Sequence, residues 1–239
     1  MPSNFPPVQP KPKLEVREVL PNQIYTVDDF FSPSELRAVL AWAQSLELEG
    51  PKKPGKGEAE RTGRTCNAFC GYKVRVKMLK LGWIGRASLH SSEIASSLLR
   101  LISPFLPSLS PPYTSQPGLS PNIRVYHYPP HTFFGQHYDM PQLDLASRRL
   151  SCWTVLVYLS DGVTGGGTTF YPHEETGKKG KKGSKTGFKY GQKGKVTVEP
   201  KAGRMLLHWH GVSGGGCMKH EGDEVLSGDK WVLRTDVLA

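Results

Sequence analysis

Two side chains that commonly bind metals, His137 and Asp139, stand two residues apart at the end of the aromatic run Phe133–Asp139. Alternate residues of a β-strand project from the same face, so these two side chains can hold one ion. The best candidate for a third ligand is His220, which Lys230 follows after ten residues. Two histidines and one carboxylate on one face of a metal leave coordination positions open, as in the non-haem Fe(II) centres that activate oxygen.

The charge of such a centre favours an anionic co-substrate. One carboxylate ligand leaves a divalent ion with excess positive charge, and few protein ligands leave room for both a co-substrate and dioxygen. A 2-oxo acid fits, because its keto oxygen and near carboxylate chelate the metal. Its far carboxylate then needs a cation, and a charge-assisted hydrogen bond there contributes ~1.5–3 kcal/mol. Lys230 is the preferred cation. Arg234 remains a rival anchor or a substrate contact, since the two side chains share a strand face roughly 13 Å apart.

Two helices are expected to support this site. The motif Ser32-Pro33-Ser34-Glu35 combines a serine cap, a proline at the first helical position and a glutamate three residues after the cap. This helix should end near Gly50. A second amphipathic helix is predicted over Ser92–Ile102, with Pro104 as its stop. The proline- and serine-rich stretch 103–121 is interpreted as an exposed connector.

From Asn122 onward the apolar pattern has the period of strands and not of helices. Strands are predicted at 123–128, 133–139, 154–159, 168–171, 195–198, 203–210 and 230–238. Short strands that follow helices indicate a mainly β fold with supporting helices, a sandwich or jelly roll with the N-terminal helices packed on one sheet. The expected parts are a flexible proline-rich tail (1–14), an N-terminal strand and helical support (15–121) and a core (122–239) with a lysine- and glycine-rich loop at 173–195.

Composition and length indicate a globular protein. The chain has 239 residues, of which 22% are charged, and can form one domain with a sizeable core. It has no apolar run of about 18 residues, so no membrane span is expected, and Met1–Leu14 lacks the apolar stretch of a secretory signal. Cys66 and Cys70 are interpreted as reduced thiols. We therefore expect an intracellular protein, cytoplasmic or nuclear.

Part of the net charge of +10 is concentrated in Lys178–Lys195, where lysines are interleaved with glycines. This segment offers too little apolar area to offset backbone ordering, so it is predicted to be a loop. It is either a basic arm that contacts phosphates or an acidic substrate, or a solvated insertion, and its composition favours the insertion. Nucleic acid is therefore an open but not favoured partner.

A rival pair of ligands, His208 and His210, shares one face of the run Leu206–His210, as zinc-binding pairs do. This run has no acidic residue or third histidine nearby. We interpret it as a core strand whose edge approaches the site.

Several motifs together resemble the catalytic domain of prolyl 4-hydroxylase-type Fe(II)/2-oxoglutarate dioxygenases. The similarity runs from about Asn122 to the C-terminus and rests on residues 128–139, 154–159 and 165–172, on His220 and on Lys230-Trp231. It implies a double-stranded β-helix, a form of jelly roll. It also implies that His137, Asp139 and His220 bind Fe(II), that Lys230 binds the far carboxylate of 2-oxoglutarate, and that Tyr128 and Thr154 assist Lys230.

The resemblance further implies a reaction and a ranking of substrates. Oxidation of 2-oxoglutarate by O2 to succinate and CO2 would be coupled to hydroxylation of a prolyl residue in a protein or peptide, with L-ascorbate as a candidate reductant. A small metabolite or a nucleic acid is an alternative substrate, and a non-catalytic metal-binding module on this fold stays open. Two positions depart from the family pattern: its usual glycine three residues after the tyrosine is His131 here, and its usual glutamate after the glycine pair is Gly167.

Overall fold

The computed structural model describes residues 4–50, 83–109, 117–172, 194–211 and 216–239. Cys66, Cys70 and all of the predicted lysine-rich loop except its last residues lie outside this part of the chain. Within it, no helix is long and apolar enough to cross a membrane.

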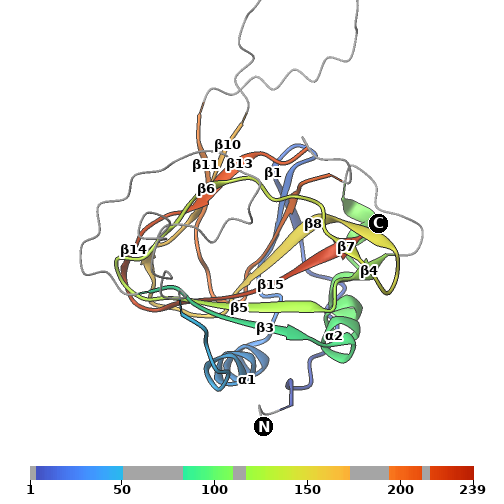
Figure 1. The fold of residues 1–239 in the computed structure, drawn as a ribbon, viewed down its shortest axis with the longest axis horizontal. Helices are drawn as coiled ribbons and strands as arrows, with labels where there is room; N and C mark the ends of the chain where they lie inside the picture. The colour runs from blue at the N-terminus through green and yellow to red at the C-terminus, as the bar shows by residue number, and fades with distance from the viewer. Residues whose placement is uncertain (1–3, 51–82, 110–116, 173–193, 212–215) are drawn as a thin grey trace, which may run out of the picture.

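The described strands form one large sheet, one smaller sheet and a short pair (Figure 1). Along the large sheet the order is β1 (Val16–Leu20), β2 (Ile24–Val27), β12 (Met205–Trp209), β8 (Arg149–Tyr158), β15 (Lys230–Leu238), β5 (Asn122–Tyr128) and β3 (Gly85–His90), with β4 (Gly118–Leu119) on β15 and β7 (Leu143–Asp144) on β8. The smaller sheet runs β11 (Val196–Val198), β10 (Thr168–Tyr171), β13 (Lys219–Gly222) and β6 (Phe134–His137). The short pair is β14 (Val225–Ser227) with β9 (Thr164–Gly165).

Both predicted helices are present and lie on the side of the large sheet that faces away from the smaller sheet (Figure 1). The first, α1 (Pro33–Gln44), has the capping box, because Ser32 and Glu35 each bond the other's backbone N–H. Its predicted end near Gly50 is wrong. The Ser45 hydroxyl donates to the Trp42 carbonyl at 2.7 Å and the chain leaves the helix there. Glu49 then forms a backbone bridge to Arg86 beside β3. The second helix, α2, spans Ser92–Ile102 as predicted.

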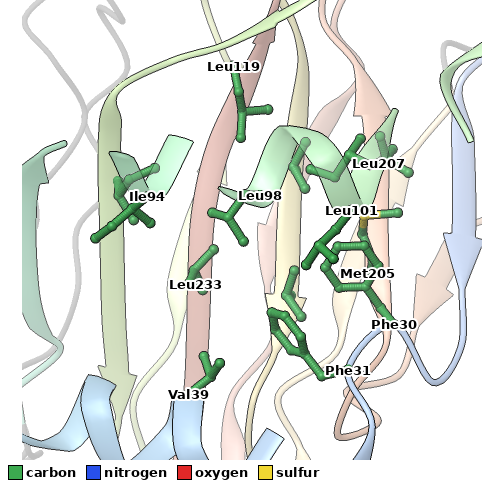
Figure 2. Packing of buried hydrophobic residues seen from close by; sticks show 14 of the residues in the cluster. Phe30, Phe31, Val39, Ile94, Leu98, Leu101, Leu119, Met205, Leu207 and Leu233 are labelled. Atoms are coloured by element: carbon green, nitrogen blue, oxygen red, sulfur yellow. The ribbon is translucent and has the colours of Figure 1, made fainter. Parts of the chain in front are cut away.

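Strand β15 separates the protein into two buried regions by the alternation of its side chains. Leu233 and Val237 join the large apolar cluster beneath α1 and α2, which includes Val39 and Leu98 (Figure 2). Val232 belongs to a second cluster that contains residues of both sheets: Leu20, Ile24, Tyr158, Phe170, Val198, Leu206 and Met218. The fold is therefore mainly β, a double-stranded β-helix with helices packed on one sheet, as predicted.

Two N-terminal stretches are more closely packed than their composition indicates. Part of the predicted exposed connector 103–121 is buried: Phe105, Leu106 and Leu109 pack into the large cluster around the short 3-10 helix η1 (Leu106–Ser108). Residues of the predicted tail contact α1, since the Phe5 ring meets Trp42 edge-on with centroids 4.9 Å apart. Apolar side chains among the prolines explain both contacts, because their burial outweighs the local turn signals.

Candidate metal centre and co-substrate site

The three predicted metal ligands lie together between the two sheets. His220 of β13 is the direct partner of His137 at the end of β6, and their rings are 4.2 Å apart between centroids. Asp139 follows two residues later, with Oδ1 3.8 Å from His137 Nε2 and Oδ2 3.8 Å from His220 Nε2. One ligand atom from each residue lies within 4.8 Å of the others, and all three residues are buried.

Backbone carbonyls set the tautomer of both histidines. His137 Nδ1 lies 2.8 Å from the Gly135 carbonyl, and His220 Nδ1 lies 2.9 Å from the Met218 carbonyl. A carbonyl only accepts hydrogen bonds, so each Nδ1 carries the proton and each Nε2 keeps its lone pair for a metal. Burial lowers the pKa of both imidazoles to about 4, so the rings are neutral at neutral pH.

One oxygen of Asp139 is occupied by protein donors. Its Oδ2 accepts a hydrogen bond from the Thr154 hydroxyl at 2.7 Å and lies 2.9 Å from Arg234 Nη2. His208 Nε2 is 3.4 Å from the same oxygen. Burial by itself raises the pKa of Asp139, but Arg234 and His208 outweigh this effect and hold the pKa of the carboxyl well below its usual range. Asp139 is thus an anion whose Oδ1 is the freer oxygen for a metal.

Lys230 is a buried cation that forms no ion pair with an acidic side chain of the described residues. Its Nζ donates to the Gly166 carbonyl at 2.6 Å and lies 5.0 Å from the Tyr128 ring centroid, and Tyr128 is its cross-strand partner on β5. No carboxylate in the described part of the chain lies within 4.0 Å of Nζ. Burial lowers the pKa of Lys230 to about 8. A buried charge of this kind is costly unless a counter-ion lies close to it.

The other two predicted co-substrate residues lie at Asp139. Arg234 bonds Asp139, on the inward face of β15 that it shares with Lys230. Thr154 donates to Asp139 and, at 3.2 Å, to Asp236. Both side chains therefore contact the candidate metal ligand.

Sequence reasoning missed several neighbours of the centre. Asp236 lies 2.9 Å from Arg124 and 3.6 Å from Arg234, and its position two residues after Arg234 on one strand face was the available signal. The thiol of Cys217 accepts a hydrogen bond from the Asp139 backbone N–H. His208, predicted to lie in a core strand near the site, does so, and with Cys217 and His220 it forms a second group of potential ligands.

The two departures from the family pattern have structural explanations. His131 has φ +64°, a left-handed conformation for which glycine is best suited but histidine is among the better substitutes. Its N–H donates to the Val225 carbonyl at 2.7 Å. At Gly167, a Cβ atom would come within 2.6 Å of Thr197 Cγ2, so this site does not accommodate glutamate without a shift.

The double-stranded β-helix with two histidines and one carboxylate between its sheets defines a class of iron enzyme. Residues 123–235 match the sequence model of the 2OG-Fe(II) oxygenase superfamily. Residues 123–235 therefore form a 2OG-Fe(II) oxygenase domain, which supports a 2-oxoglutarate-dependent dioxygenase. Fe(II), 2-oxoglutarate and O2 are the cofactor and co-substrates of this superfamily. No curated protein sequence matches the chain.

Solved structures with a similar fold include prolyl hydroxylases. One, from Trichoplax adhaerens in complex with a peptide fragment of the hypoxia inducible factor oxygen degradation domain, has a TM-score of 0.55 at 18% identity, covering 91% of this chain and 84% of that chain. The viral collagen prolyl hydroxylase of Paramecium Bursaria Chlorella virus-1 with 2OG has a TM-score of 0.52 at 17% identity, covering 91% and 96%. A 2OG-Fe(II) oxygenase family oxidoreductase from Burkholderia pseudomallei has a TM-score of 0.55 at 14% identity, covering 90% and 85%.

Proposed function

We propose that this dioxygenase hydroxylates a prolyl residue of a protein or peptide, with release of succinate and CO2. The similarity of the fold to prolyl hydroxylases, one of them bound to a peptide fragment, supports this substrate class.

We assign the metal ligands to His137, Asp139 and His220. The donor set suits Fe(II), because both Nε2 atoms are free of protons and one oxygen of the carboxylate is available. When bound, iron and 2-oxoglutarate supply the activated oxygen that oxidises an unactivated C–H bond. The protein side chains hold and orient the ligands and exclude water, since all three are buried.

We assign Lys230 and Tyr128 to the far carboxylate of 2-oxoglutarate. The observation that carries this assignment is the burial of the Lys230 ammonium group without an acidic partner among the described residues. Thr154 and Arg234 are assigned to Asp139, because both bond its Oδ2.

An anaerobic titration tests the assignment. Fe(II) and then 2-oxoglutarate are added to the purified protein, and the visible metal-to-ligand charge-transfer band is recorded in the wild type and in His137→Ala. We expect the band in the wild type only. Its absence from folded, metal-loaded wild type would overturn the assignment.

Succinate release then identifies the substrate class. Proline-containing peptides are compared with free proline, other small metabolites and oligonucleotides, each with and without L-ascorbate. We expect stimulation by peptides, and stimulation only by metabolites or oligonucleotides would refute the prolyl proposal.

A further inference from the structure

Four buried charged side chains form a connected row that starts at the candidate ligand Asp139. Arg234 Nη2 lies 2.9 Å from Asp139 Oδ2 and 3.6 Å from Asp236 Oδ1, and Arg124 Nη2 lies 2.9 Å from Asp236 Oδ2. Their side chains are between 3% and 16% exposed, so solvent screens these charges weakly. We call Asp139, Arg234, Asp236 and Arg124 the buried quartet.

The buried quartet holds two positive and two negative charges, so its net charge is zero. His137 and His220 add none, because each donates Nδ1–H to a carbonyl and keeps Nε2 unprotonated. A centre with one carboxylate ligand ordinarily carries one unbalanced negative charge, which attracts a divalent ion. Here Arg234 balances that charge at hydrogen-bond distance from Asp139.

This balance makes binding of a bare divalent ion unfavourable. The ion would bring two positive charges into buried surroundings that offer no net negative charge, and desolvation of such a charge is costly. The 2-oxoglutarate dianion brings two negative charges and removes the imbalance. Lys230 stands four residues before Arg234 on β15 and would face the far carboxylate of the co-substrate.

We propose that the buried quartet keeps the affinity of the centre for a divalent ion low until 2-oxoglutarate binds, so that metal and co-substrate bind cooperatively, with Arg234 as the positioning residue. This inference rests on the metal ligands assigned under the proposed function. By linkage, the factor by which 2-oxoglutarate raises metal affinity equals the factor by which the metal raises 2-oxoglutarate affinity.

Single substitutions can change the charge of the buried quartet while its remaining members stay paired. In Arg234→Met, the Thr154 hydroxyl still donates to Asp139, and Arg124 still pairs with Asp236. The net charge then becomes −1. In Asp236→Asn it becomes +1, and the amide still offers an oxygen to Arg124. Opposite charge changes predict opposite changes in metal affinity, whereas a purely geometric role of the row predicts weaker binding in both variants.

The experiment measures binding of Mn(II), a redox-stable probe of the Fe(II) site, by the loss of its free-ion EPR signal. The full-length chain is titrated with and without saturating 2-oxoglutarate. We expect the wild type to bind Mn(II) at least about tenfold more tightly with 2-oxoglutarate than without it. Without 2-oxoglutarate, Arg234→Met should bind Mn(II) about tenfold more tightly than the wild type, and Asp236→Asn about tenfold more weakly. The gain from 2-oxoglutarate should shrink in Arg234→Met.

Two further variants control for loss of folding and of ion pairs in general. Arg234→Lys keeps the charge, so its Mn(II) affinity without 2-oxoglutarate should lie closer to that of the wild type than the affinity of Arg234→Met does. Arg204→Met removes an arginine whose Nε lies 2.6 Å from Asp28 Oδ1, at the far end of β12 from His208, and should leave Mn(II) affinity unchanged. Thermal melts establish that each variant is folded.

The outcomes separate the inference from the proposed function. Weaker Mn(II) binding in both Arg234→Met and Asp236→Asn, or no effect of 2-oxoglutarate in the wild type, overturns the proposed cooperativity. Mn(II) binding that is the same in the wild type and in His137→Ala overturns the ligand assignment instead.

Discussion

Replacement of Lys230 by methionine tests whether this buried cation serves an incoming carboxylate. Methionine has a similar length and keeps the apolar contacts but removes the charge. Burial lowers the pKa of Lys230 from 10.5 to about 8, which corresponds to roughly 3 kcal/mol of unfavourable free energy in the folded protein at neutral pH. The variant also loses the hydrogen bond from Nζ to the Gly166 carbonyl, worth about 1 kcal/mol. Without ligands, we expect Lys230→Met to be ~2 kcal/mol more stable than the wild type at pH 7.

This advantage should depend on pH in a defined direction. A lysine whose folded-state pKa is lowered destabilises the fold fully below about pH 8, and the effect disappears as the pH rises through about 8 toward 10.5. The wild type should therefore gain stability over this interval, and the difference from Lys230→Met should shrink. Urea unfolding of both proteins at several pH values, without metal or 2-oxoglutarate, measures it.

The same substitution should weaken the binding of 2-oxoglutarate. Loss of one charge-assisted hydrogen bond of ~1.5–3 kcal/mol corresponds to roughly 10- to 150-fold lower affinity for 2-oxoglutarate, measured from the charge-transfer band under anaerobic conditions. As a control, Lys201→Met removes a half-exposed lysine that pairs with Asp28, and should change stability by less than about 1 kcal/mol. A Lys230→Met protein that is less stable than the wild type and binds 2-oxoglutarate as tightly would refute the reasoning.

Four further substitutions test the site and the fold. His137→Ala and Asp139→Ala should each abolish substrate-dependent succinate release, because each removes one of the three proposed metal ligands, and substantial coupled turnover in either would contradict the ligand assignment. Leu98→Ala should lower the free energy of unfolding in urea by ~2–5 kcal/mol, since this side chain lies on the buried face of α2, and a loss below ~1 kcal/mol would count against that packing. Ser32→Ala should lower the free energy of unfolding by about 1 kcal/mol through loss of the cap, whereas Ser34→Ala, in the first turn of the same helix, should not.

The parts of the fold that follow from local signals were predictable from the sequence. The start of α1 follows from its capping motif, and the bounds of α2 agree with its amphipathic period, which ends just before a proline. The end of α1 was not predictable, since the chain leaves the helix to let Glu49 pair with Arg86. Strand β3 (Gly85–His90) was missed because only Leu89 among its alternating apolar positions has a large side chain, which makes a weak strand signal, and its place is set by pairing with β5.

The candidate site was predictable to a similar degree. The two-residue spacing of His137 and Asp139 predicted that they lie together, and they do, although β6 ends at His137. The spacing from His220 to Lys230 indicated a third candidate ligand, which the structure brings beside them. The partner of Arg234 was not predictable, because strand alternation shows which face a side chain occupies but not which acid from the other sheet meets it. Asp236 was overlooked although its position two residues after Arg234, on the same face of β15, was an available signal.

Strand β15 has a consequence for how this protein can change. Its odd-numbered positions build the core beneath the helices, and its even-numbered positions carry Lys230, Arg234 and Asp236. Two sets of side chains with different roles therefore alternate along nine residues. Residues of one set can be substituted while the side chains of the other set keep their positions. Deletion of a single residue within the strand would exchange the two sets, sending charges toward the helices and apolar side chains toward the metal centre. Insertions and deletions should thus be tolerated in the loops and rejected here.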